Sequence, residues 1–452
     1  MARMTLLWVV TYFAGLTASF VNPLFGTLTY LFEYYLRPSF HWWGRSLPDL
    51  RWNFMIAAVL TATYVLRRSS LPDAGAPRRG PTLCVALLGG YMLLMTPFAA
   101  RPDLSFEKTT QFLKMALFHG LVIGTVRTEA AFDAFVAVHM AGAGWWGWEA
   151  YRNPRRTAGR LANVGSGDTR GDNGAAAHLL TVLPFAVAYL LLHRDKRLRA
   201  LALLVTPFVV NTIILCNSRG AVLALIVCGL TAVWLARPGH RIRMLAVGFV
   251  AAAGFLYLAD PIFIARQATT TRFQEDGSAA GRLEAWRGAV DLVRDHPLGA
   301  GGQGFWELSP VYAPELVERL GEKRDPHNTF VLVASEWGLP GLALFLGYYL
   351  TSFHLLRQVR RRAREGGIWY YRSVAIHLSL VALLVAGSFT DRLYAEAPLW
   401  MGALAVALHR LQARSLSAGA EVPHARSDSR LVVASPRPLP VARAAERLQG
   451  LR

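Results

Sequence analysis

A histidine at the edge of an apolar segment is the first candidate for catalysis in this chain. His327 follows Asp325-Pro326 and precedes a long apolar run. A neutral histidine can accept a hydroxyl proton near physiological pH, so His327 is a candidate general base. Two candidate substrate-binding groups follow: Asn328, and Glu336 nine residues after His327. The alternative is structural: a histidine at a helix entrance, and a buried glutamate paired with an arginine.

Two arginines are candidates for binding an anion. Arg219 stands in Asn217-Ser218-Arg219-Gly220, between two apolar segments almost without a loop. A charge at such a position is costly and usually functional or paired, although an arginine can also extend to the membrane surface. Arg282 lies at the start of a predicted helix, where the macrodipole does not favour a positive charge. A guanidinium can bind phosphate oxygens in a bidentate way and neutralise a diphosphate leaving group.

Metal and cofactor chemistry is not expected from the sequence. The outer loops carry no acidic DxD-like cluster, so no metal and no cofactor are predicted. The three cysteines, Cys84, Cys216 and Cys228, lie in apolar segments without CxxC spacing and read as small buried hydrophobes. The glycine-rich run from His296 to Gly304 lacks the Lys-Ser/Thr of a phosphate-binding loop, and predicts only a flexible turn.

The elements that must position these residues are membrane helices. The 452 residues are 53% hydrophobic and only 17% charged, whereas about 25% charged residues are typical of soluble domains. Apolar segments long enough to cross a bilayer predict an all-α polytopic protein of about twelve helices. They fall at 4–20, 52–66, 81–98, 108–125, 129–148, 174–192, 199–217, 220–236, 244–263, 329–356, 369–389 and 396–412. The aromatic stretch 21–51 either lies at the interface or contains a further span.

The distribution of charge predicts the orientation. The net charge of +19 would suggest nucleic acid in a soluble protein, but the basic residues sit in short loops, as the positive-inside rule requires. Four of these loops hold 16 Lys/Arg against 3 Asp/Glu, whereas the loop 264–328 holds 8 basic and 10 acidic residues. We therefore expect loop 264–328 outside and both termini in the cytoplasm. No nucleic-acid partner is expected.

This pattern divides the chain into four parts. Residues 1–263 form the first nine spans, 264–328 the outer loop, 329–412 the last three spans, and 413–452 a basic tail without apolar periodicity. The tail is predicted to be disordered and to touch anionic lipid. In the outer loop, Leu283, Trp286, Val290 and Val293 recur every three or four residues, which predicts an amphipathic helix against the bundle.

One outer loop departs from the charge rule. Residues 149–173 hold 5 Arg against 3 acids, yet the alternation of spans places them outside. Either these arginines are paired locally or the topology is wrong at this point. The functional alternative is that outward-facing arginines bind an anionic ligand.

The motifs together resemble the O-antigen ligase family, which includes polymerases and O-oligosaccharyltransferases. They are Ser218-Arg219-Gly220-Ala221, Gly281-Arg282…Trp286 with Pro297-Leu-Gly, and His327-Asn328…Glu336-x-Gly338-x-x-Gly341. Their order and the single long outer loop also match, over roughly residues 170–412. The run from Gly277 to Trp286 and the Asn22-Pro23 stretch most resemble the ligases associated with exosortase systems. The resemblance implies a glycosyltransferase-C-like fold in the bacterial inner membrane.

The resemblance also implies an activity and roles for individual residues. Members transfer a glycan from an undecaprenyl-diphosphate carrier to an acceptor hydroxyl on the periplasmic face, with inversion and without metal. Arg219 and Arg282 would bind the diphosphate, and His327 would activate the acceptor. Looser candidates for the same site are Arg160, Arg272 and Asn173. The acceptor would be lipid A–core, protein or glycan, and membrane lipids would surround the enzyme.

Two alternatives remain open. The first is a polymerase of the same superfamily, whose acceptor is another lipid-linked glycan. The second is a transporter or flippase of polysaccharide or lipid, although such folds often show internal repeats, and none is visible here.

Overall fold

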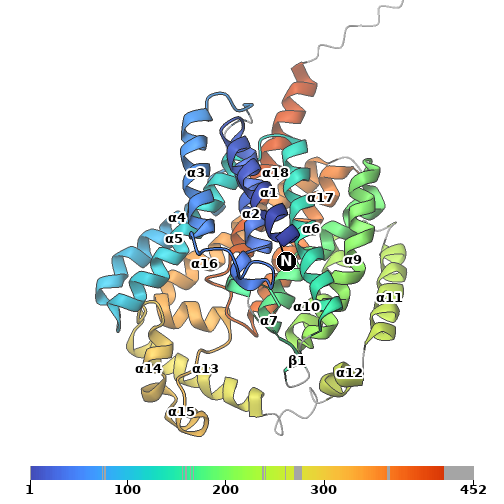
Figure 1. Ribbon diagram of the computed structural model, residues 1–452. Coiled ribbons are helices and arrows are strands. Elements are labelled where there is room, and N and C mark those ends of the chain that lie inside the picture. The colour runs from blue at the N-terminus through green and yellow to red at the C-terminus, as the bar shows by residue number, and fades with distance from the viewer. Residues whose placement is uncertain are drawn as a thin grey trace, which may run out of the picture. The chain divides into compact units, whose positions relative to one another are not determined.

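The computed structural model describes most of the chain as a helical bundle (Figure 1). The described residues are 2–421 except 74, 76–77, 155, 158–159, 163, 166, 170, 237–238, 240, 260, 269–276 and 364–366. The chain divides into a unit Met1–Gln412 and a unit Ala413–Arg452, and everything below concerns the first. The candidate Arg272 and the predicted disordered tail beyond Glu421 lie outside the described residues.

Helices make up almost all of the described structure. The first twelve are α1 (Ala2–Ser19), α2 (Pro23–Tyr35), α3 (Trp52–Arg67), α4 (Gly80–Met95), α5 (Pro102–Thr125), α6 (Glu129–Arg152), α7 (Asp172–Leu179), α8 (Leu183–Leu192), α9 (Lys196–Cys216), α10 (Arg219–Leu235), α11 (Arg241–Leu258) and α12 (Pro261–Ala268). They continue with α13 (Gly277–Asp295), α14 (Gly304–Tyr312), α15 (Pro314–Leu320), α16 (Thr329–Arg362), α17 (Ile368–Gly387) and α18 (Glu396–Glu421). Short turns complete them: η1 (Pro38–Phe40), η2 (Thr96–Phe98), η3 (Gly167–Thr169) and the antiparallel pair β1 (Arg156–Thr157) and β2 (Arg160–Leu161).

All twelve predicted apolar segments fall on helices, which agrees with an all-α membrane protein. Within the described residues, five helical segments are long and apolar enough to cross a membrane. They are Gly80–Phe98, Asp172–Leu191, Lys196–Cys216, Thr329–Arg362 and Ile368–Gly387. The number of twelve spans therefore stays a prediction. Figure 1 shows α12 to α15 and β1 gathered at one end of the bundle.

The ambiguous stretch 21–51 contains the helix α2. Its start is encoded locally, since the Asn22 side chain accepts a hydrogen bond from Leu24 N and Pro23 occupies the first helical position. The side chain of Tyr30 on α2 then reaches the carboxylate of Glu396 on α18 at 2.9 Å. This helix therefore turns into the core of the bundle rather than lying along an interface.

The insertion of α2 changes the expected path of the N-terminus. Tyr12 donates to the carbonyl of Trp52 at the start of α3, and Ser19 bonds Thr63 near its end. Helices α1 and α3 therefore run in the same direction. Because Arg127 donates to the carbonyl of Arg68, the end of α3 lies beside the end of α5. Arg410 of α18 donates to the last carbonyls of α5.

The first residues of α1 and the end of the unit near Gln412 thus lie toward opposite ends of the bundle. The expectation that both termini face the cytoplasm stays a prediction, because the C-terminal residues belong to the second unit. Helix α2 accounts for the parallel course of α1 and α3, since it reverses the chain between the first apolar segment and the second.

The outer helix α13 is amphipathic, but its buried face is not the predicted one. The residues packed inward are Ala285, Ala289 and Leu292, each at most 2% exposed. Leu283 and Val290 are instead 38% and 50% exposed. Small side chains let α13 approach α14 closely, since a Cβ at Gly288 would lie 2.2 Å from the carbonyl oxygen of Tyr312. The prediction from sequence had placed the larger side chains on the buried face.

The glycine-rich run is held firmly by backbone hydrogen bonds rather than being a flexible turn. Ala300 N–H donates to the carbonyl of Ser335, and Gly301 N–H to that of Glu336. Helix α16 breaks its regular geometry at Gly338 to permit this pairing, with φ 65° and ψ −171°. A Cβ at Gly338 would lie 2.3 Å from the carbonyl carbon of Leu298, so only glycine fits.

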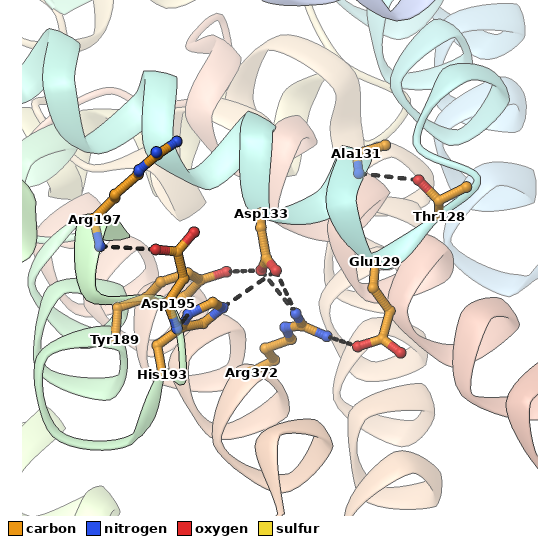
Figure 2. Close-up of polar contacts among 9 residues, drawn as sticks. All are labelled: Thr128, Glu129, Ala131, Asp133, Tyr189, His193, Asp195, Arg197 and Arg372. Atoms are coloured by element: carbon orange, nitrogen blue, oxygen red, sulfur yellow. Dashed lines mark hydrogen bonds and ion pairs between the residues drawn. The ribbon is translucent and has the colours of Figure 1, made fainter. Parts of the chain in front are cut away.

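A closed cluster of charges joins α6, α8 and α17 (Figure 2). Arg372 donates to Glu129 at 2.7 Å and to both carboxylate oxygens of Asp133 at 2.7 and 2.8 Å. Asp133 also accepts from Tyr189 and contacts His193 at 3.2 Å. Arg372 is 3% exposed, so its charge is desolvated and needs these partners.

Candidate functional site

A polar cavity of about 210 Å³ lies at the start of α16. Three kinds of element form its wall: α5, the start of α16, and the connections that precede α7, α14, α16 and α18. The lining residues are Lys108, Gln111, Asp168, Gln303, Asp325, Leu332, Glu336, Asp391, Arg392 and Tyr394.

His327 stands at the rim of this cavity. Its Nδ1 lies 3.4 Å from Oδ2 of Asp391, and its side chain is 44% exposed. The backbone of His327 has φ 49°, in the left-handed region that a non-glycine residue adopts only at a cost. The flanking contacts impose it: Trp286 of α13 donates to the carbonyl of Pro326 at 2.8 Å, and Asn328 caps α16.

Asn328 is occupied by this capping role. Its Oδ1 accepts from Phe330 N at 3.0 Å and from Val331 N at 3.3 Å, which satisfies two of the unpaired amides at the start of α16. The side chain of Asn328 thus positions its neighbour His327. The cap alone explains why an asparagine stands at this position, without the predicted contact to substrate.

The connection 388–395, which carries Asp391, is fixed to the entrance of α16. Thr329 Oγ1 donates to the carbonyl of Thr390 and accepts from Arg392 N–H. The guanidinium of Arg392 donates to the carbonyls of Asp391 and Asp168 at 2.7 and 2.9 Å. These bonds hold the Asp391 carboxylate facing His327.

Glu336 reaches the cavity from α16 and is bound on both oxygens. Oε1 accepts from the backbone N–H of Gln303 at 2.7 Å, and Oε2 from the Tyr394 hydroxyl at 2.6 Å. Its partners are thus an amide and a phenol rather than an arginine. Glu336 ties the glycine-rich run to the connection before α18, and forms the floor of the cavity.

Asp325 is a further acid of the wall, on the connection before α16. Burial, and then the nearby charge of Asp391, raise the pKa of its carboxyl to about 6. His327 and Lys108 act in the opposite direction but do not offset the burial. A carboxyl group in this state can exchange a proton at neutral pH.

A second polar cluster connects the segment between α6 and α7 with the start of α10. Asn173 Oδ1 accepts from Arg160 at 2.8 Å and from the hydroxyl of Ser218 at 2.7 Å. Arg160 also forms an ion pair with Asp172 at 2.5 Å. Ser218 caps α10, so Arg219 is its first residue and is half-buried. The structure thus joins Arg160, Asn173 and Ser218 by hydrogen bonds, and Arg219 follows Ser218 in the chain.

The cavity and this arginine cluster adjoin each other. A Cβ at Gly174 would lie 3.2 Å from Nη2 of Arg392, and a Cβ at Gly220 would lie 3.0 Å from the Phe389 side chain. Arg282 is the sixth residue of α13, the helix whose Trp286 holds the segment before His327. It is half-buried.

Several residues of the cavity were not singled out from the sequence. They are Lys108, Gln111, Asp168, Gln303, Asp391, Arg392 and Tyr394. A signal existed for the pair Asp391-Arg392, because two charges stand together between the last two apolar segments. Lys108 and Gln303 carry no such signal, since each is a single polar residue whose position depends on packing. The described residues contain no group of three or more His, Cys, Asp or Glu suited to a metal ion.

The fold and the site define a helical membrane protein with a polar cavity at the start of α16. The profile of the O-antigen ligase family matches residues 202–346, from α9 to α16. This match confirms the resemblance to that family, and it includes Arg219, Arg282, His327 and Glu336. It supports a glycosyltransferase-like enzyme of the membrane glycan ligase or polymerase type. No curated protein gives a significant match to the chain.

Proposed function

We propose that this protein is a glycan ligase of the bacterial inner membrane, which moves an oligo- or polysaccharide from undecaprenyl diphosphate to an acceptor hydroxyl on the periplasmic face. The observation that carries the proposal is His327, held against Asp391 at the rim of a polar cavity beside an arginine cluster. A base and an anion site a short distance apart are what a displacement at a sugar diphosphate requires.

In the proposed reaction His327 acts through Nε2, because Nδ1 faces Asp391. Asp391 orients the ring and stabilises the positive charge that His327 gains. The acceptor oxygen gives its proton to Nε2 and bonds to the anomeric carbon. The bond from that carbon to the diphosphate oxygen breaks, and the electron pair leaves with the diphosphate. Attack from the opposite side inverts the anomeric centre.

The arginines stabilise the leaving diphosphate. Arg219 begins α10, so the positive end of the helix dipole adds to its charge. Arg282 would join it from α13. The charge of Arg160 is already matched by Asp172, so this pair would have to open for Arg160 to bind phosphate. No metal ion or cofactor is invoked.

The test is transfer by the purified protein in detergent or proteoliposomes, supplied with lipid-linked glycan and candidate acceptors, with the product identified by mass. Transfer that is lost in both His327→Ala and Arg219→Ala, while each variant stays folded in the membrane, is the expected result. Full activity in either variant would overturn the mechanism.

A polymerase remains the alternative in the same class. A deletion strain separates the two, since loss of a ligase leaves long unattached chains, whereas loss of a polymerase leaves single repeat units. Transfer by the purified protein would exclude transport as its main activity.

A further inference from the structure

The wall of the cavity contains groups that the fold already uses and groups that remain open to a ligand. Both oxygens of Glu336 accept hydrogen bonds, and Arg392 donates to two backbone carbonyls. By contrast, the side chains of Lys108, Gln303 and Asp325 make no hydrogen bond with any other described residue. Lys108 only approaches the ring of Tyr394, with Nζ 5.2 Å from its centroid.

The sign of the charge disfavours a diphosphate in this cavity. Among the described residues, four carboxyl groups line it against two basic groups, so it has no excess of positive charge to attract a diphosphate. Placing a further anion beside Asp325 and Asp391 would add to the repulsion that already acts between these two acids. Carboxylates, a primary amide and an ammonium are instead the groups that hydrogen-bond to hydroxyls, because together they supply both donors and acceptors.

The size of the cavity fits one sugar ring. Its volume of about 210 Å³ corresponds to roughly seven water molecules at ~30 Å³ each. A glycan chain would not fit inside, but its terminal ring would, with the rest of the chain outside. Asp391 belongs both to this wall and to the pair with His327, so a ring in the cavity presents a hydroxyl toward the base.

We infer that this cavity is the acceptor subsite, and that it takes the terminal, hydroxyl-bearing sugar ring of an acceptor glycan. Lys108, Gln303 and Asp325 determine the specificity by hydrogen-bonding to its hydroxyls. The donor diphosphate then binds at the neighbouring cluster of Asn173, Ser218 and Arg219. This assignment rests on the proposed ligase function and adds to it the chemical class of the acceptor.

The kinetic test uses the full chain with a lipid-linked glycan donor and a soluble oligosaccharide acceptor that ends in an unblocked hexose. Lys108→Ala and Gln303→Asn each remove one hydrogen bond to the acceptor, and asparagine tolerates the left-handed φ of 60° at Gln303. Each variant should raise the acceptor KM about tenfold, which is roughly what one hydrogen bond contributes, and change the donor KM less than about twofold. Arg219→Lys should show the reverse pattern.

The matched control is Lys114→Ala, on the same helix as Lys108 but exposed and outside the cavity wall. It should leave both KM values unchanged. If Lys108→Ala and Gln303→Asn raise the donor KM, or change neither KM, the acceptor subsite is wrong. Transfer to a serine-containing peptide in preference to the oligosaccharide would equally overturn it.

A binding measurement separates this inference from the proposed function. The oligosaccharide alone, added to purified protein without donor, should raise the thermal unfolding temperature of the wild type and of Lys114→Ala, but not of Lys108→Ala. If this shift occurs while no donor supports transfer, the ligase proposal fails and the sugar site stands. If transfer occurs without a shift that depends on Lys108, the ligase stands and the sugar site fails.

Discussion

Helix α17 has a histidine–aspartate pair near each of its ends, and the two pairs are built differently. At its start, Asp133 contacts His193 at 3.2 Å and is also bound by Arg372 and Tyr189 (Figure 2). Beyond its end, Asp391 contacts His327 at 3.4 Å, and its Oδ1 is buried without a hydrogen-bond partner among the described residues. The first histidine is 11% exposed and the second 44%.

The difference separates a structural ion cluster from a site with room for a substrate. In the Arg372 cluster the positive charge is matched by two acids, so the group gains nothing from a ligand. Between His327 and Asp391 the distance is longer, the histidine is accessible, and a cavity adjoins it. The same two residue types thus serve stability at one end of α17 and chemistry, as proposed, at the other.

The largest expected effect is on activity. His327→Ala should lower the rate of glycan transfer about 10²- to 10⁴-fold, because the acceptor hydroxyl loses its general base. The measurement is initial rate per folded protein in proteoliposomes. The matched control is His193→Ala, which should keep the wild-type rate. Equal losses in the two variants would mean that the comparison between the pairs is mistaken.

The second expected effect is on stability. Arg372→Met leaves Asp133 buried without its cation, which should lower the free energy of unfolding by about 3–5 kcal/mol. Thermal unfolding in detergent measures this, and transfer per folded protein should stay near the wild-type value.

Two further variants make this test specific. Arg294→Met breaks an exposed ion pair with Asp291 and should change stability by less than about 0.5 kcal/mol. Adding Asp133→Asn to Arg372→Met should recover part of the loss. A double variant no more stable than the single one would show that uncompensated charge is not the cause.

The third prediction concerns the floor of the cavity. Gly338→Ala places a Cβ 2.3 Å from the carbonyl carbon of Leu298, at a φ of 65°. We expect a loss of about 1–3 kcal/mol in stability together with lower transfer, because the floor must shift. Gly347→Ala, on the same helix, meets only Cys84 Sγ at 3.4 Å and should be neutral or slightly stabilising. Similar behaviour of the two variants would argue against a strained floor.

The smallest effect depends on pH. Because burial raises the pKa of Asp325 to about 6, its charged form destabilises the fold at pH values above 6, and this penalty disappears as the pH falls toward 4. Asp325→Asn should therefore stabilise the protein at pH 8 by about 1–2 kcal/mol, allowing for partial exposure, and have no effect at pH 4. The thermal unfolding temperature at both pH values checks the sign. A stabilisation confined to pH 4 would refute it.

Much of the fold was predictable because the bilayer imposes a strong local signal. Runs of apolar residues mark helices whatever their neighbours, and all twelve predicted segments are helical. The predictions from sequence were wrong where helix packing determines which residues are buried. Helix α2 mixes tyrosines, threonines and a glutamate, so its apolar signal was weak, yet it packs in the core. On α13 the alanines pack inward because close approach to α14 requires small side chains.

For this protein, then, the sequence by itself determined the membrane class, the resemblance to the O-antigen ligase family and the candidates His327, Arg219 and Arg282. Each of these depends on local composition or on a motif with fixed spacing. Only the tertiary structure brought Asp391 to His327 across 64 residues of sequence, and Lys108 to the same cavity from α5. The physical reason is that polar groups in a bundle find their partners through helix packing, and their distance along the chain does not encode that packing.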